Sequence, residues 1–109
     1  MAGEARRVSA PEAWELIESG FSLVDVRTEI EWSMGHPSRA CNVPWELQTT
    51  GGLRPNDEFL TVMQAIYPPE ARLLTFCKQG RRSLGAAEAL IAAGFAEVID
   101  VRPGWGGLR

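Results

Sequence analysis

Short apolar runs alternate along this chain with longer segments that carry apolar residues at every third or fourth position. The short runs are typical of buried strands, and the longer segments are typical of helices with one apolar face. The runs cover residues 5–8, 21–26, 73–76 and 97–101. Strands that alternate with helices predict an α/β fold, in which helices cover both faces of an open parallel sheet.

Capping residues mark where the predicted helices begin and end. Ser9 with Glu12, and Thr28 with Glu31, have the spacing of a capping box. Glycine or a proline pair ends each helix. The predicted helices cover residues 9–20, 28–35, 56–67 and 84–93, with Asn56 as the cap of the third. Residues 48–55 are polar and contain two glycines, so we expect them to form a loop.

One cysteine stands where the third buried run ends and a polar loop begins. Cys77 follows residues 73–76, and the loop after it contains Gly80 and three cations before the helix at 84–93. Ligands of open parallel sheets bind at the carboxyl ends of the strands, which is where this cysteine is predicted to lie. A buried structural cysteine is the alternative, but such a residue is not expected to open a loop of glycine and cations.

The predicted loop has the chemistry of an anion site. Backbone N–H groups that converge at a helix N-terminus attract negative charge. Gly80 allows the backbone to turn where a Cβ would clash. Lys78, Arg81 and Arg82 add positive charge around the loop. These surroundings favour the thiolate of Cys77, which is the nucleophilic form of cysteine.

Phosphate ester hydrolysis and sulfur transfer both use a cysteine in such a loop. A tyrosine-phosphatase loop has five residues between its cysteine and its arginine. Here four residues separate Cys77 from Arg82, and Ser83 takes the fifth-spaced position. The smaller ring of N–H groups suits a single sulfur atom better than a phosphate group, so loop length favours sulfur transfer.

Composition narrows the class of protein. A chain of 109 residues with 45% hydrophobic and 23% charged residues is typical of one globular domain. Its net charge of −3 gives no overall attraction to nucleic acid or to an anionic membrane, and neither is an expected partner. Two cysteines without a signal peptide suggest free thiols in the cytoplasm. With one histidine, neither a metal site nor another cofactor is predicted.

Two motifs resemble the rhodanese sulfurtransferase family. The segment 77–83 matches Cys-x-x-Gly-x-Arg-Ser, the active loop of single-domain rhodaneses. The segment 23–36 resembles the family's amino-terminal signature, with Asp25-x-Arg27, an acidic-aromatic pair and Gly35-His36. Residues 42–44 match the short strand that follows that signature.

The resemblance implies one rhodanese domain over residues 1–109, with five strands in the order 1-5-4-2-3. Family members commonly continue after the last strand with a glycine turn, a tryptophan and a final helix. Gly104-Trp105 resembles that turn, and the sequence ends at Arg109. We therefore expect either that the protein lacks the last helix or that the chain is truncated.

The resemblance also implies a double-displacement sulfurtransferase. Cys77 would take the outer sulfur of an anionic donor such as thiosulfate and pass it, as a persulfide, to cyanide or to a thiol such as glutathione or thioredoxin. The expected substrate-binding residues are Lys78, Gln79, Gly80, Arg81, Arg82, Ser83 and Arg27. Alternatives are a sulfur carrier or regulatory module for a dedicated partner and, less favoured, a phosphatase or arsenate reductase of the same fold.

Four other residues each allow a structural and a functional interpretation. Asp25 and Arg27 lie at the end of a strand, at the same sheet edge as Cys77, so they could orient substrate. Alternatively, Asp25 caps the following turn and Arg27 pairs with acidic neighbours. His36 could be a general base, but its place before a turn favours a structural hydrogen bond. Cys41 could be a resolving thiol, but its context favours a small buried side chain.

Overall fold

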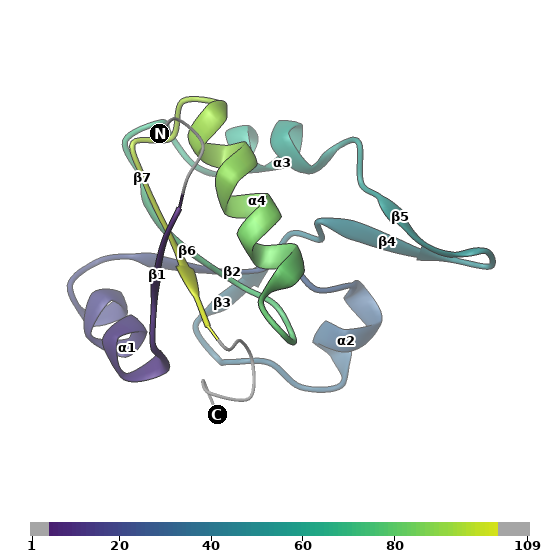
Figure 1. Cartoon of the computed structure of the whole chain (residues 1–109), viewed down its shortest axis with the longest axis horizontal. Helices are drawn as coiled ribbons and strands as arrows, with labels where there is room; N and C mark the ends of the chain where they lie inside the picture. Colours follow the sequence, from purple (N-terminus) through teal and green to yellow (C-terminus); the bar gives the residue numbers. More distant parts are fainter. Residues whose placement is uncertain (1–4, 103–109) are drawn as a thin grey trace.

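The computed structural model describes residues 5–102 and has an α/β fold (Figure 1). Its main sheet contains five strands, and every pairing between them is parallel. In spatial order these strands are β1 (Arg6–Val8), β7 (Glu97–Val101), β6 (Arg72–Phe76), β2 (Ser22–Asp25) and β3 (Ala40–Asn42). Counted along the chain without the separate hairpin, the order is 1-5-4-2-3, which confirms the predicted topology.

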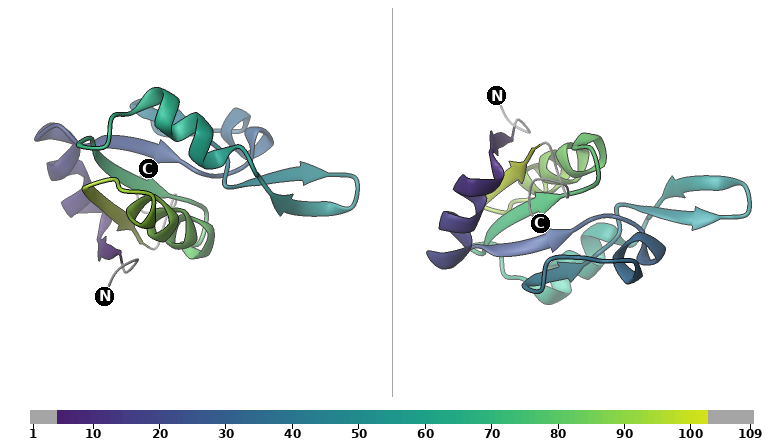
Figure 2. Two further views of the ribbon diagram at one scale, coloured as in Figure 1. Left: turned by 90° about the horizontal axis from the view of Figure 1, so that it is seen from above. Right: turned by 90° about the horizontal axis from the view of Figure 1, so that it is seen from below.

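Helices cover both faces of this sheet, as the alternation of strands and helices predicted. α1 (Ala10–Glu18) packs on one face, whereas α3 (Phe59–Ile66) and α4 (Arg81–Ala92) pack on the other (Figure 2). Neighbouring residues of the central strands enter opposite cores, as Leu23 and Val24 do in β2. Parallel strands buried on both faces require such continuous apolar runs.

Both predicted capping boxes are present. The Ser9 side chain accepts a hydrogen bond from the Glu12 N–H at the start of α1, and Thr28 does the same for Glu31 at the start of α2 (Glu29–Ser33). In each box the glutamate side chain bonds back to the backbone of the capping residue. These bonds satisfy N–H groups that the first turn of a helix leaves free.

The segment predicted as a loop at residues 48–55 is mostly a β-hairpin. β4 (Glu46–Thr49) and β5 (Gly52–Pro55) pair antiparallel and extend away from the main sheet (Figure 1). Gly52 has φ +109°, and the Thr49 hydroxyl donates a 2.7 Å hydrogen bond to its carbonyl oxygen. The glycines therefore mark a tight turn between two short strands rather than a long irregular loop.

Other boundaries also differ from the prediction. Glu58, not Asn56, is the N-cap of α3, because Asn56 instead accepts a hydrogen bond from the Glu58 N–H in a turn before the helix. α4 begins at Arg81 rather than near residue 84, since its first turn is polar and carries no apolar pattern. β3 ends at Asn42, two residues before Pro44, which has no N–H to donate.

Two expectations concern features beyond these elements. The turn expected at Gly104-Trp105 lies outside the described residues. Among residues 5–102, no helix has the length and apolar character needed to span a membrane.

Candidate functional site

Cys77 lies at the carboxyl end of β6, directly before the loop that leads into α4. Its side chain is 1% exposed and belongs to the core on the α3 and α4 face. Gly80 is the N-cap of α4 and has φ +93°, a left-handed conformation that favours glycine. This turn brings the first residues of the helix back over the cysteine.

Two backbone N–H groups point at the Cys77 sulfur. The Gly80 N–H donates to Sγ at 3.0 Å, and the Ser83 N–H donates at 3.3 Å. Both belong to the loop and first turn of α4, where the helix dipole adds partial positive charge. The arrangement stabilises negative charge on sulfur, so the Cys77 thiolate can act both as a nucleophile and as a leaving group.

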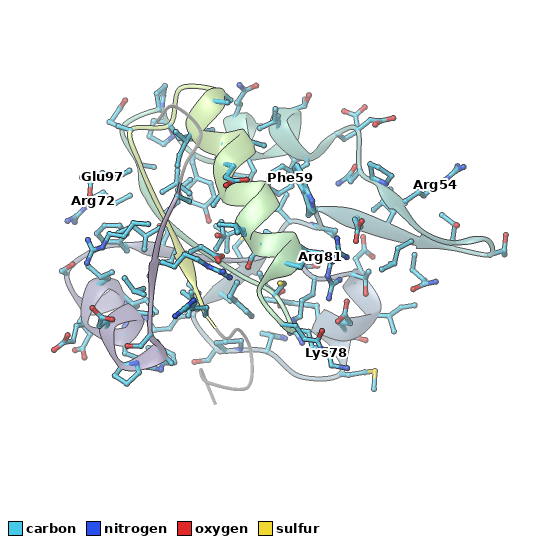
Figure 3. The ribbon with its side chains drawn as sticks, viewed as in Figure 1. Arg54, Phe59, Arg72, Lys78, Arg81 and Glu97 are labelled. Atoms are coloured by element: carbon cyan, nitrogen blue, oxygen red, sulfur yellow. The ribbon has the colours of Figure 1, made fainter. Side chains whose placement is uncertain are left out.

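A pocket of about 250 Å³ opens beside this sulfur. Its lining residues are Leu53, Cys77, Lys78, Gln79, Arg81 and Arg82. Figure 3 shows Lys78 and Arg81 near the beginning of α4, and Arg54 out on the hairpin. Four of the expected substrate-binding residues therefore surround the pocket, while Gly80 and Ser83 contribute their backbone N–H groups to the sulfur.

The three cations of the loop differ in how firmly they are held. Arg82 has a side chain 10% exposed and forms two hydrogen bonds with Glu31, at 2.8 Å to Oε1 and 3.0 Å to Oε2. Arg81 is 75% exposed and lies 3.5 Å from Glu46. Lys78 is exposed. Arg82 thus forms a fixed wall of the pocket, and the more exposed cations lie at its mouth.

The pairing of Arg82 with Glu31 changes the acidity of both groups. Hydrogen bonds from Arg82, supported by those from Thr28, lower the pKa of Glu31 from 4.5 to about 2 despite its partial burial. The same bonds raise the pKa of Arg82. Both side chains therefore stay charged over the whole physiological pH range.

Arg27 is placed differently from the other expected binding residues. Its side chain is buried, forms a 2.8 Å ion pair with Asp25, and donates a 2.7 Å hydrogen bond to the Gly35 carbonyl oxygen. Arg27 does not line the pocket at Cys77. This geometry favours the structural interpretation of the Asp25–Arg27 pair.

His36 and Cys41 also have structural surroundings. The His36 ring stacks on Trp32 at 3.3 Å, and its Nδ1 lies 2.8 Å from the Trp32 carbonyl oxygen. Cys41 is half-buried on β3 and packs against the core. No group of three or more histidine, cysteine or acidic side chains within residues 5–102 could hold a metal ion.

Sequence reasoning missed two residues of this site. Leu53 lines the pocket from the hairpin, and the expectation of an irregular loop there concealed it. Glu31 was recognised as half of a capping box, but its bond to Arg82 spans 51 sequence positions. A buried arginine beside an active loop requires an acidic partner, and that requirement is the signal that could have led to Glu31.

Comparison with known proteins identifies the family. The model of the Rhodanese-like domain matches residues 9–108. Thiosulfate sulfurtransferase 18 of Arabidopsis thaliana is 36% identical over 106 residues, which cover 95% of this chain and 78% of that protein. Senescence-associated protein DIN1 of Raphanus sativus is 39% identical over 93 residues, which cover 85% of this chain and 51% of that protein. The chain spans about half the length of the first curated relatives that it matches.

Solved structures agree with this match. The human single-domain sulfurtransferase TSTD1 superposes with a TM-score of 0.74 at 25% identity, over 94% of each chain. The crystal structure of Rv0390 from M. tuberculosis gives a TM-score of 0.75 at 30% identity, over 93% of this chain and 80% of that chain. With its fold and these relatives, the chain belongs to the family of proteins with a Rhodanese-like domain.

Proposed function

We propose that this protein transfers sulfane sulfur from an anionic donor such as thiosulfate to a thiol or cyanide, through a persulfide on Cys77. The observation that carries the proposal is the Cys77 sulfur, which accepts two backbone hydrogen bonds at the edge of a pocket lined by cations. Relatives named as thiosulfate sulfurtransferases support the choice of donor.

The proposed reaction is a double displacement. The Cys77 thiolate attacks the outer sulfur of thiosulfate, the S–S bond of the donor breaks, and sulfite leaves with the electron pair. An acceptor thiolate or cyanide then attacks the outer sulfur of the persulfide, and the Cys77 thiolate leaves. The N–H groups of Gly80 and Ser83 lower the barrier of the second step, because they stabilise the negative charge that returns to the cysteine sulfur as it leaves.

The cations of the pocket have separate proposed roles. Lys78 and Arg81 are exposed at the mouth, where they attract the anionic donor and hold its sulfonate end together with Gln79. Arg82 is already bound to Glu31, so it contributes positive charge and shape to the pocket wall rather than a free hydrogen-bonding fork. The buried Arg27 bonds to Asp25 and Gly35 and does not line the pocket, so its proposed contribution is structural.

The acceptor and the compartment are also proposals. A small thiol such as glutathione, or the thiol of thioredoxin, fits the second step chemically. The two cysteines are unpaired, as expected in a reducing compartment such as the cytoplasm. Because several relatives are named as chloroplastic, localisation of the tagged protein in its source cells is the appropriate test.

Steady-state kinetics with thiosulfate and cyanide test the proposal. We expect thiocyanate formation with the parallel-line pattern of a ping-pong mechanism. Lys78→Ala should raise the KM for thiosulfate about three- to tenfold, since a charge-assisted contact is lost. Arg54→Ala removes an exposed cation from the hairpin and serves as the matched control, with an unchanged KM. Hydrolysis of an aryl phosphate by the wild type, without thiocyanate formation, would contradict the proposal.

A further inference from the structure

Beneath the Cys77 loop, three polar side chains form a row across neighbouring strands. Arg7 on β1 is the register partner of Asp100 on β7, and Asp100 is the partner of Thr75 on β6. Register partners point to the same face of a sheet, and here that face lies under α4. Asp100 and Thr75 are fully buried. Burying polar groups costs free energy unless they are hydrogen-bonded, so these side chains need hydrogen-bond partners.

The bonds of the row lead to the active loop. Arg7 Nε donates to Asp100 Oδ2 at 3.0 Å, and Thr75 Oγ1 donates to Asp100 Oδ1 at 3.0 Å. Arg7 Nη2 donates to the Gly80 carbonyl oxygen, also at 3.0 Å. Thr75 Oγ1 lies 3.2 Å from the Ser83 carbonyl oxygen. The row therefore contacts the same two residues, Gly80 and Ser83, whose N–H groups point at the Cys77 sulfur.

The Gly80 carbonyl is the group of the loop whose orientation depends most on Arg7. Gly80 has no Cβ, so its backbone can change conformation at little steric cost. Besides Arg7, its carbonyl oxygen accepts only a long bond of 3.3 Å from the Leu84 N–H, among the contacts of residues 5–102. Rotation of the glycine would also turn its own N–H, which is 3.0 Å from Cys77 Sγ. The carbonyl and the N–H of Gly80 belong to the peptide units on either side of its Cα, so a charged donor that holds the carbonyl restricts the backbone rotations at Gly80 that would move the N–H.

We propose that Arg7, held by Asp100, is a positioning residue for the Cys77 loop. Asp100 orients the guanidinium through Nε, and the guanidinium uses Nη2 to hold the Gly80 carbonyl oxygen. The edge strand β1 thereby contributes to a site that lies 73 sequence positions away. The consequence for sulfur transfer rests on the proposed function, but the effect on the thiol itself does not.

Alkylation of Cys77 measures the loop directly. All variants carry Cys41→Ala, so Cys77 is the one remaining thiol. The rate of reaction with iodoacetamide, a neutral reagent, is followed from pH 5 to pH 10 in Arg7→Met. Arg6→Met is the matched control, because Arg6 precedes Arg7 on the same strand and is exposed. Circular dichroism and thermal unfolding show whether each variant is folded.

Arg7→Met should slow alkylation at neutral pH by about three- to tenfold and move the midpoint of its pH profile upward, because the thiolate loses a fixed donor. Arg6→Met should behave as the parent does. An Arg7→Met protein that is less stable but keeps the parent's pH profile would show a purely structural role and overturn the proposal.

Two further variants apply if Arg7→Met does not fold. Arg7→Lys keeps the charge but lacks the planar fork that reaches Asp100 and Gly80 together, so an intermediate rate is expected. Asp100→Asn leaves Arg7 in place without its anionic anchor and should shift the profile in the same direction. If the folded variants among these keep the parent's pH profile of alkylation, the proposal is overturned. Persulfide formation is assayed separately, so the alkylation rates test the role of Arg7 even if the protein forms no persulfide.

Discussion

At the level of single residues, Glu31 links a helix cap to the Cys77 loop. Its Oε1 accepts hydrogen bonds from the N–H and hydroxyl of Thr28, both at 3.1 Å, and from Arg82 at 2.8 Å. The same carboxylate thus completes the capping box at the start of α2 and holds the arginine of the Cys77 pocket. A change at Glu31 should therefore affect both stability and the site.

Glu31→Gln should change how stability depends on pH. The pKa of Glu31 is lowered from 4.5 to about 2 in the folded protein, so its contribution is complete above about pH 4.5 and is lost as pH falls toward 2. The glutamine variant should have a smaller free energy of unfolding at neutral pH and a flatter decline over that acid range. Urea unfolding at several pH values measures both.

Glu29→Gln is the control for this experiment, since Glu29 is an exposed residue of the same helix. The free energy of unfolding of this variant should decline at acid pH as steeply as that of the wild type. An acid decline in Glu31→Gln as steep as that of the wild type would show that the Arg82 pair does not stabilise the fold.

At the scale of elements, the β4–β5 hairpin forms a wall of the site. Leu53 on β5 lines the Cys77 pocket and is 46% exposed. Leu47 on β4 is 39% exposed and pairs with Arg54, whereas Leu53 pairs with Gln48. Adjacent residues of a strand point to opposite faces, so the two leucines lie on opposite faces of the hairpin.

Leu53→Asp should weaken use of an anionic donor. A carboxylate at the pocket wall repels thiosulfate, and we expect its KM to rise about threefold while folding is retained. Leu47→Asp places the same charge on the other face of the hairpin and should change the KM much less. Equal effects of the two substitutions on the KM would show that the hairpin does not face the donor.

Much of the fold could be predicted from the sequence, because the buried strands are continuous apolar runs and the capping boxes are local signals. The position of Cys77 and its loop could also be predicted, since these residues are contiguous in the chain. The partners of that loop were not, because Arg7 and Glu31 reach it across 73 and 51 positions. Leu53 was missed for a different reason: two glycines in a polar segment indicated a loop where the chain forms a hairpin.

At the scale of the whole molecule, the site is built on the core between the sheet and helices α3 and α4. Phe59 of α3 is 1% exposed, and its ring meets Trp45 edge-on at 5.0 Å between centroids. Cys77 belongs to the same core cluster as Phe59. Loop geometry at the cysteine therefore depends on packing across the whole of this face.

Phe59→Ala should lower the free energy of unfolding by about 3–5 kcal/mol, the usual cost of removing a buried aromatic ring. Ile66→Ala, on the same helix at a residue 46% exposed, should cost less than about 1 kcal/mol. Guanidinium unfolding of both variants measures the difference. Similar losses in the two proteins would contradict the burial of Phe59 in the core.

In the proposed reaction, Cys77 carries the transferred sulfur. Intact mass spectrometry of the protein after incubation with thiosulfate, without an acceptor, tests it most directly. The wild type and Cys41→Ser should each gain the mass of one sulfur atom, which cyanide then removes, and Cys77→Ser should gain none. A wild type that gains no sulfur, or a Cys77→Ser variant that gains one, would contradict transfer through a persulfide on Cys77.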